Sequence, residues 1–455
     1  MQHSILELAE LFRSGKLSPV ELTQSCLARI EKLNPVLNAF ITVTPESALA
    51  QARQAEAEIR AGNWHGPLHG IPLGLKDLID TAGVRTTAAS ALFKDRIPEG
   101  DADVVTLLKA AGAVLLGKHN LHEFAYGGSS MISYYGDVRN AWTPEHIAGG
   151  SSGGSATAVA AGMCVGAIGT DTAGSIREPA VLCSVVGLKP TYGRVSARGV
   201  IPLSVSLDHV GPIARTVADC AAIFEVISGN GQKKGTTAAE PSSWIEPVKP
   251  GLRVGVLRRF FCEELDSEVA SSLEAALQVL EVLVGEVRDI EIQVSTDRTL
   301  QSAEAYAYHA EFVRRSPGLY QPETLRRILT GQNITQDELH AQLLELERTR
   351  LEMGRVFEDV DLLVSPTTPI PAPSIAELKE NLDLLRPREI VLLRNTRPFN
   401  VWGLPAISIP CGFTRAGLPV GLQIAGPHWA EARVFQLAQA YEQSTDWHKR
   451  EPRLS

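Results

Sequence analysis

The sequence lacks the features that mark several broad classes of protein. Only six of its 455 residues are cysteines, and none of them forms a C-x-x-C pair. Four of these cysteines lie among apolar residues, which predicts buried free thiols and a reducing compartment such as the cytoplasm. No apolar run approaches the roughly 20 residues that a membrane-spanning helix needs, and the first residues lack the pattern of a secretory signal. We therefore expect a cytoplasmic protein that does not bind a membrane.

Charge and composition exclude further classes. The net charge is -9, which disfavours a protein that binds nucleic acid through overall positive charge. Charged residues make up 21% of the chain and hydrophobic residues 44%, so the chain can form a large core and is not globally disordered. No internal repeat is present. These totals favour a globular protein that does not bind nucleic acid through its overall charge, and they leave a local basic patch open.

The order of the predicted elements indicates an α/β fold. The first 60 residues are predicted to be helical, and Ser18, Pro19 and Glu21 form the capping box of one helix there. From residue 68 onwards short apolar strands alternate with helices, which predicts a largely buried sheet. Further predictions are a surface loop at 230–250, a strand at 252–258, mostly helix at 266–358, a strand at 361–369, a hairpin at 405–426 and a last helix at 431–444.

Seven consecutive residues, 149–155, are glycine or serine and read GGSSGGS. Composition alone favours a flexible linker. The run passes directly into ATAVAAGMC, a segment of small helix-forming residues that a linker would not enter. A phosphate-binding loop is not matched either, because no lysine follows the glycines and the G-x-G-x-x-G pattern is absent. We therefore interpret the run as part of the folded core.

Two polar side chains lie where nucleophilic chemistry could use them. Ser175 follows an Ala-Gly pair and precedes a predicted helix, so nearby backbone N–H groups could bind an oxyanion; the alternative is that Ser175 only caps the helix. Lys76 lies in the apolar stretch IPLGLKDLID, where burial would lower its pKa; the alternative is a surface ion pair with Asp77. No histidine motif pairs with Ser175, and the two histidines of HNLH at 119–122 lack further ligands for a metal.

Together these segments resemble the amidase signature family of serine hydrolases. The resemblance is dense over 66–215 and weak over 220–360; it is carried by GIPLGLKD, GGSSGGSATAVAAG, GTDTAGSIREPA and GLKPTYGRVS, with LNPVLNAFITV near the start and GLPAISIPCGF and LPVGLQIAGP near the end. It implies one domain over 1–455 with a central mixed, twisted β-sheet covered by helices on both faces. Its expected parts are N-terminal helices at 1–65, the catalytic core at 66–215, a variable and largely helical region at 220–360, and the rest of the sheet with the last helix at 361–455.

The resemblance also implies a Ser–cisSer–Lys triad without a cofactor or metal. Ser175 corresponds to the nucleophile, Ser151 to the bridging serine with a cis peptide bond, and Lys76 to the general base, while Ser152 is expected to support the lysine. The oxyanion hole corresponds to the backbone N–H groups of Thr172, Ala173, Gly174 and Ser175. Ala173 departs from the family's usual glycine, and we expect it to narrow the pocket or restrict the backbone there.

The substrate segment of the family corresponds to residues 122–136. Ala125, Tyr126 and Gly127 are its predicted substrate-binding residues. Tyr126, Met131, Tyr134 and Tyr135 would suit an apolar or aromatic substrate; the alternative is that these side chains belong to the core.

Two branches of the family must be distinguished. One branch comprises free hydrolases, and the other is the glutamine-hydrolysing A subunit of tRNA-dependent amidotransferases, which EFAYGGSS and KPTYGRVS resemble. Leu393 argues against this second branch because its members carry an aspartate there that is thought to hold the amino group of glutamine, and the chain ends soon after DWHKREP. We therefore expect a free amidase, a monomer or homodimer, that cleaves a small apolar or aryl amide, carbamate (as a urethanase) or ester without nucleic acid. An inactive binding protein is disfavoured by the intact Lys76, Ser151 and Ser175.

Overall fold

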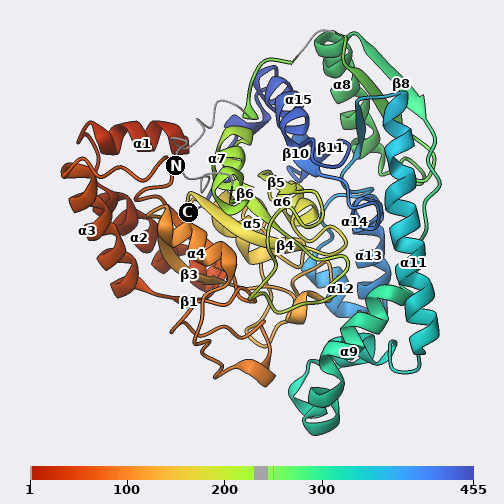
Figure 1. Ribbon diagram of the computed structural model, residues 1–455, viewed down its shortest axis with the longest axis horizontal. Coiled ribbons are helices and arrows are strands. Elements are labelled where there is room, and N and C mark those ends of the chain that lie inside the picture. The colour runs from red at the N-terminus through yellow and green to blue at the C-terminus, as the bar shows by residue number, and fades with distance from the viewer. Residues whose placement is uncertain (1–2, 230–243, 249–250, 455) are drawn as a thin grey trace.

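A mixed sheet of 11 strands forms the centre of the protein (Figure 1). The computed structural model describes residues 3–229, 244–248 and 251–454. The strands are β1 Phe40–Val43, β2 Pro72–Lys76, β3 Val114–His119, β4 Gly166–Asp171, β5 Val186–Lys189, β6 His209–Ala214, β7 Arg253–Leu257, β8 Glu286–Ile290, β9 Leu362–Pro366, β10 Ala406–Phe413 and β11 Pro419–Ala425. Their order across the sheet is β1-β3-β2-β4-β6-β5-β10-β11-β9-β7-β8.

The sheet combines parallel and antiparallel pairs. Strand β2 pairs in parallel with both β3 and β4, and β7 pairs in parallel with β8 and β9. Strand β4 pairs antiparallel with β6, and β10 pairs antiparallel with β5 and β11. Every residue of β2, β4 and β6 is buried, as expected for central strands covered on both faces. The predicted α/β class with a central mixed sheet is therefore confirmed.

Helices flank the sheet and form both ends of the molecule. They are α1 Ile5–Arg13, α2 Pro19–Leu37, α3 Pro45–Arg60, α4 Asp103–Ala110, α5 Gly153–Ala160, α6 Arg177–Leu182, α7 Val217–Ile227, α8 Ser267–Val284, α9 Thr299–Arg315, α10 Pro322–Leu329, α11 Gln336–Glu352, α12 Ile375–Glu380, α13 Leu385–Leu392, α14 Arg397–Val401 and α15 Glu431–Gln443. In Figure 1, α1, α2 and α3 gather at one end of the molecule, and α9 and α11 lie at the other. Helices α5 and α6 lie between these two groups.

Local sequence signals account for several of these elements. The predicted capping box of α2 is present, because Ser18 accepts a hydrogen bond from Val20 N and Glu21 accepts one from Ser18 N. The predicted hairpin is formed by β10 and β11, and the predicted last helix is α15. Strand β8 lies within a region that we predicted to be mostly helical. Most of the predicted surface loop at 230–250 lies outside the described residues.

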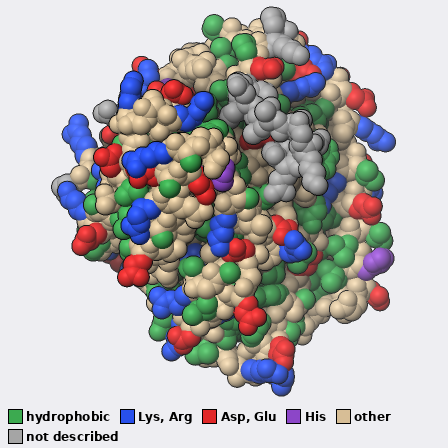
Figure 2. All heavy atoms as spheres, turned by 60° about the vertical axis from the view of Figure 1, so that its left-hand side comes forward, with side chains coloured by type: hydrophobic (Ala, Val, Ile, Leu, Met, Phe, Trp, Pro, Cys, Tyr) green, Lys and Arg blue, Asp and Glu red, His purple; other side chains and the backbone are tan. Residues whose placement is uncertain are grey.

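The burial of the cysteines matches a further prediction. All six cysteines are free thiols, and five of them are buried. Within the part of the chain that the structure describes, no helix is both long and apolar enough to cross a membrane. On the face shown in Figure 2, Lys and Arg side chains are interspersed with Asp and Glu side chains. That face therefore has no broad region of one charge sign.

Candidate active site

The parallel pairing of β2 and β4 brings the predicted catalytic segments to one edge of the sheet. Strand β2 ends at Lys76, and β4 ends at Asp171, just before the loop that carries Ser175. Because the two strands are neighbours and run in the same direction, their carboxyl ends lie together. The Gly/Ser run 149–155 is entirely buried and leads into α5 beside them. The interpretation of this run as folded core is therefore confirmed.

Lys76 is completely buried and faces two hydroxyl groups. Its Nζ donates to Ser151 Oγ at 2.7 Å and to Thr170 Oγ1 at 2.9 Å. Burial lowers the pKa of Lys76 to about 7, although the negative charges of Asp171 and Asp208 oppose this shift. At neutral pH a substantial fraction of this lysine is therefore the uncharged amine that a general base must be. The alternative of a surface ion pair with Asp77 is wrong.

Asp77 is buried as well, and it faces a different segment. Its carboxylate accepts hydrogen bonds from the backbone N–H and the hydroxyl of Thr87. Burial raises the pKa of Asp77 to about 6. The lysine and the aspartate are adjacent in sequence, but alternate side chains of an extended segment point in opposite directions, so only the lysine faces the serines.

Ser151 follows a cis peptide bond, which joins it to Gly150. The N–H of Gly150 donates to the buried carboxyl group of Glu178 at 2.7 Å, and Ser130 Oγ donates to the carbonyl of Ser151. A side chain at Gly154 would place its Cβ only 2.3 Å from the carbonyl oxygen of Asn120. The glycines of the run thus allow neighbouring backbone to approach where a side chain would not fit.

Ser152 lies next to the bridging serine but does not bond to the lysine. Its Oγ donates to the carbonyl of Thr170 at 3.2 Å, and the Thr170 hydroxyl accepts from Lys76. Ser152 therefore supports the lysine indirectly, by holding the strand that contacts it.

Ser175 lies on the loop between β4 and α6 and is 3% exposed. Its carbonyl accepts from the backbone N–H of Ser152 at 3.2 Å, which ties the two serine segments together. Among the hydrogen bonds of the described residues, none joins the hydroxyls of Ser151 and Ser175. The structure thus brings Ser175 to the site but does not itself complete the predicted relay between the two hydroxyls.

The predicted oxyanion hole has three unpartnered backbone donors instead of four. Gly174 donates its N–H to Asp171 Oδ1 at 2.8 Å, so it is not available for a substrate. The N–H groups of Thr172, Ala173 and Ser175 have no hydrogen-bond acceptor in the described part of the chain. Gly174 is nevertheless required, because its φ is +134° and a Cβ there would lie 2.0 Å from Thr396 Oγ1.

A buried ion pair that we did not predict holds the loop that carries Ser175. Arg177 contacts both carboxylate oxygens of Asp171, with Nε–Oδ2 at 3.0 Å and Nη2–Oδ1 at 2.9 Å. Burial would raise the pKa of Asp171, but Arg177 holds it well below its usual range. Arg177 also donates to the Thr396 carbonyl and to Asn400 Oδ1. The only signal in the sequence was an aspartate and an arginine that flank the predicted loop.

The predicted substrate segment is mostly buried. Ala125 is 4% exposed and Tyr126 is 3% exposed, and the carbonyl of Tyr126 accepts from Arg327 Nη1 at 2.6 Å. A Cβ on Gly127 would lie 2.2 Å from His122 and 2.6 Å from the same arginine nitrogen. This segment is therefore fixed by α10, to which Arg327 belongs, and the region we predicted to be variable contributes to the site.

The other apolar side chains of the segment have separate environments. Met131 is 7% exposed and packs with Ile147 and Leu378 in a hydrophobic cluster, so it belongs to the core. Tyr134 is 48% exposed, and its ring contacts that of Tyr135 edge to face. Core packing thus accounts for Met131, as the alternative proposed.

The two histidines of HNLH point to different partners. His119 Nδ1 lies 3.1 Å from Ser155 Oγ, and His122 Nε2 lies 3.3 Å from Arg327 Nη1. Burial lowers the pKa of both histidines. The guanidinium group of Arg327 beside His122 disfavours the binding of a metal cation there, so these two histidines do not form a metal site.

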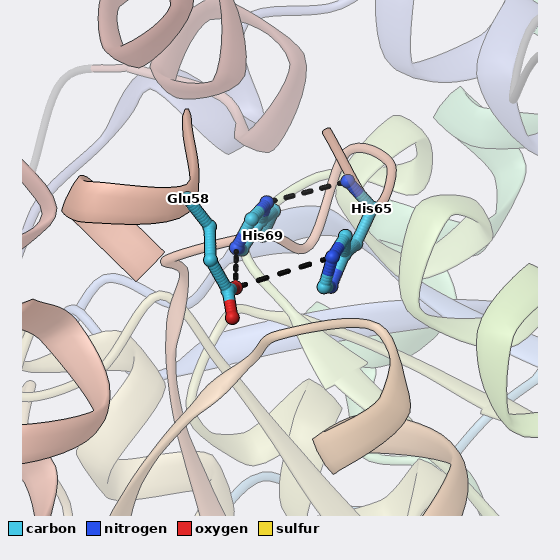
Figure 3. A group of neighbouring side chains, drawn as sticks. All are labelled: Glu58, His65 and His69. Atoms are coloured by element: carbon cyan, nitrogen blue, oxygen red, sulfur yellow. Dashed lines mark hydrogen bonds and ion pairs between the residues drawn. The ribbon is translucent and has the colours of Figure 1, made fainter. Parts of the chain in front are cut away.

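Another group, shown in Figure 3, has the residue types of a metal site: Glu58, His65 and His69. His69 Nδ1 accepts from the backbone N–H of His65 at 3.3 Å, so its hydrogen is on Nε2, which lies 3.0 Å from Glu58 Oε2. Both ring nitrogens of His69 are therefore used within the protein. The internal hydrogen bonds explain this group without a metal ligand role.

Comparisons with known proteins agree on the family. The family model described as Amidase matches residues 21–435. The A subunit of glutamyl-tRNA(Gln) amidotransferase from Roseiflexus sp. (strain RS-1) is 41% identical over 100% of this chain and 98% of that protein. The structure of 6-aminohexanoate cyclic dimer hydrolase is 31% identical, with a TM-score of 0.88 and coverage of 99% of this chain and 98% of that one. The structure of the corresponding A subunit from Thermotoga maritima is 34% identical, with a TM-score of 0.75 and coverage of 95% of each chain.

These comparisons overturn our choice of branch. We expected a free amidase with a small-molecule substrate, a monomer or homodimer that works without nucleic acid, and the full-length match to an amidotransferase subunit contradicts this expectation. Leu393 and the position of the last residues carried that choice. A substitution at the single position of Leu393 alters one contact with a substrate, whereas sequence identity along the whole chain reflects both the fold and the rest of the site. The chain belongs to the amidase signature family, and it is closely similar to the A subunits of glutamyl-tRNA(Gln) amidotransferases.

Proposed function

We propose that this chain is the glutamine-hydrolysing A subunit of a tRNA-dependent amidotransferase, where it releases ammonia from the side-chain amide of glutamine. The observation that carries the proposal is the 41% identity to such a subunit over the whole chain. The six unpaired cysteines support a reducing compartment such as the cytoplasm for this work. In this role its partners are the other subunits of the complex and a tRNA.

The proposed chemistry begins with the neutral amine of Lys76. Its lone pair takes the proton of Ser151, and Ser151 takes the proton of Ser175, whose oxygen attacks the amide carbon. The 2.7 Å separation of Lys76 Nζ and Ser151 Oγ supports the first transfer. Negative charge then develops on the amide oxygen, and in this scheme the N–H groups of Ala173 and Ser175, which have no acceptor among the described residues, stabilise it.

The relay then runs in the opposite direction. The protons return to the leaving nitrogen, the C–N bond breaks, and ammonia departs from an acyl-enzyme on Ser175. A water molecule loses a proton to the same relay, attacks the ester carbon, and releases the acid and the serine hydroxyl. The burial of Lys76 supports this scheme, because the lysine can take a proton at neutral pH only if its pKa is lowered.

Ammonia release from glutamine tests the proposal. The full chain is assayed alone and together with the partner subunits and glutamylated tRNA, with Ser175→Ala as the inactive control. We expect glutamine-dependent ammonia release that requires Ser175 and increases in the presence of the partners. Labelling by a fluorophosphonate reports separately whether Ser175 is reactive. A chain that is labelled at Ser175 but releases no ammonia from glutamine in either condition would contradict the proposed function.

A further inference from the structure

A short loop, 203–208, contacts the segment that carries Ser175. It ends at Asp208, whose Oδ1 accepts from Thr172 Oγ1 at 2.5 Å. Thr172 directly follows β4, and its backbone N–H is one of the three predicted oxyanion donors that have no acceptor among the described residues. The position of the 203–208 loop therefore affects the position of an oxyanion donor.

Asp208 also holds the 203–208 loop together from within. Its Oδ2 accepts from the N–H of Leu203 at 2.9 Å and from the N–H of Ser204 at 3.1 Å. Its own N–H donates to the carbonyl of Ser204 at 2.8 Å. The carboxylate thus bonds to two donors of the loop and to the hydroxyl of Thr172, so a displacement of the loop displaces the partner of Thr172.

Glu304 of helix α9 contacts the same loop through both of its carboxylate oxygens. Its Oε2 accepts from the hydroxyl of Ser204 and from the N–H of Ser206 at 3.2 Å, and its Oε1 accepts from the hydroxyl of Ser206. Ser204 is completely buried and bonds to both carboxylates, to Asp208 through its N–H and to Glu304 through its hydroxyl. A continuous series of hydrogen bonds therefore joins α9 to Thr172.

Helix α11 supports the loop from a second direction. Arg350 Nη2 donates to the carbonyl of Ser206 at 2.7 Å, and the guanidinium group lies 4.1 Å from the ring centre of Tyr192. The hydroxyl of Tyr192 donates to the carbonyl of Val205 at 3.0 Å. Leu207 packs with buried leucines of α9 and α11. Because both helices lie at one end of the molecule (Figure 1), the 203–208 loop connects that end to the candidate active site.

The chemistry of the site is sensitive to small displacements at Thr172. Donors stabilise an oxyanion only when they lie about 2.7–3.1 Å from the oxygen, and a misplacement of about 1 Å can lower a rate by about a hundredfold. Asp208 also acts on the base, because its negative charge raises the pKa of Lys76. Loss of the contact between α9 and the loop should therefore impair the chemical step.

We propose that Glu304 is a positioning residue of the active site, which fixes Thr172 through Ser204 and Asp208 and thereby sets the geometry of the oxyanion hole from helix α9. Glu304 does this without contact to the substrate, so it affects the rate of the chemical step and not the binding of the substrate. The effect on glutamine hydrolysis rests on the proposed function. The reaction of Ser175 with a fluorophosphonate reports the same geometry without it, because the phosphoryl oxygen takes the place of the oxyanion.

Glu304→Ala is the first test. In the full chain with its partner subunits we expect kcat for ammonia release from glutamine to fall by about tenfold or more, with KM within about twofold of wild type. Labelling of Ser175 by a fluorophosphonate should slow by a similar factor. Glu304→Gln should restore most of both rates, because its amide oxygen still accepts and the serine hydroxyls can rotate to accept from its NH₂ group.

Glu311→Ala is the matched control. It removes the same charge from the same helix, at an exposed position that pairs only with Arg315. It should leave kcat, KM and the labelling rate unchanged. Ser206→Ala is a second variant for the case in which Glu304→Ala does not fold, because it removes one hydrogen bond to Glu304 and leaves the carboxylate in place. We expect it to slow labelling about threefold.

A double-mutant cycle with Thr172→Val distinguishes positioning from general stabilisation. Thr172→Val removes the hydroxyl that bonds to Asp208 and keeps the backbone N–H. In this background Glu304→Ala should slow labelling by less than about twofold, because the contact through which it acts is already lost.

Equal factors for Glu304→Ala in the two backgrounds, or wild-type labelling by folded Glu304→Ala, would overturn the proposal. So would wild-type labelling by Ser206→Ala if Glu304→Ala does not fold. If labelling depends on Glu304 as expected but glutamine is not hydrolysed, the proposed function fails and the positioning role of Glu304 stands.

Discussion

Lowering the pH through neutrality should inactivate the enzyme by protonating Lys76. This lysine is completely buried, and burial lowers its pKa from 10.5 to about 7. Only the neutral amine has a lone pair that can take the proton of Ser151. The structure therefore predicts that kcat/KM follows the fraction of neutral lysine and reaches a plateau on the alkaline side.

The magnitude follows from the shifted pKa. A change from 10.5 to about 7 corresponds to about 5 kcal/mol in favour of the neutral form. With a pKa near 7, about one lysine in ten is neutral at pH 6, half at pH 7 and about nine in ten at pH 8, so kcat/KM should rise about tenfold from pH 6 to pH 8. A lysine with the ordinary value would be neutral in only about one molecule in three thousand at pH 7.

The same shift has a consequence for stability. The unfolded chain binds a proton at Lys76 below pH 10.5, whereas the folded chain binds it only below about pH 7, so stability rises with pH between these two values. Lys76→Met removes this titration. The gain in stability of Lys76→Met over wild type should therefore be larger at pH 7 than at pH 10, by about 3–4 kcal/mol.

The assay is kcat/KM for ammonia release between pH 5.5 and 9.5, together with the rate at which a fluorophosphonate labels Ser175. Labelling does not depend on the ionisation of an amide substrate, so both profiles should share the same acid limb. Asp77→Asn is the critical control, because burial raises the pKa of Asp77 to about 6 and its titration could imitate that limb. A profile that is flat from pH 6 to 9, or an acid limb that disappears in Asp77→Asn, would refute the role of Lys76.

Four further variants test the groups around the triad. Asp208→Asn removes a carboxylate that raises the pKa of the lysine, so the acid limb should move to lower pH; an unchanged or higher midpoint would contradict this coupling. Gly174→Ala places a Cβ 2.0 Å from Thr396 Oγ1. We expect this variant to lose about 2–4 kcal/mol of stability in urea unfolding and to be labelled much more slowly by a fluorophosphonate. The control Ala173→Gly should change stability by about 1 kcal/mol or less. Burial holds the pKa of Glu178 well above 4.5, so the folded protein loses stability as the pH rises and the glutamate of the unfolded chain ionises. Glu178→Gln should therefore be more stable than wild type at pH 8 but not at pH 4. The opposite trend would show that Glu178 is ionised in the folded protein.

Features that depend on neighbouring residues could be predicted from the sequence. The capping box of α2 lies within four residues, and the β10–β11 hairpin is closed by a short turn, so each is decided locally. Strand β8 could not be predicted in the same way. Its sequence EVRDI carries three charges and is mostly exposed, and it forms a strand because β7 offers a parallel partner beside it.

The candidate site shows the same difference between features decided locally and features that depend on distant residues. The positions of Lys76, Ser151 and Ser175 could be predicted because each lies in a short segment of characteristic residues. The groups that hold them could not, because Arg177 reaches Asn400 and Gln423 across more than 200 residues of sequence.

The contacts of Asp171 indicate what the buried Asp171–Arg177 ion pair does near Lys76, the lysine that must be uncharged to act as a base. A free carboxylate at this position would attract the proton of Lys76 and raise its pKa, but Arg177 compensates the charge of Asp171 through two hydrogen bonds. The carboxylate then has a second effect, because it accepts the N–H groups of Gly174 and Ile176. The intervening N–H of Ser175 is left without an acceptor in the described chain, next to the serine hydroxyl. In the proposed mechanism, burial lowers the pKa of the base, and the ion pair orders the loop so that the N–H of Ser175 is left for the oxyanion.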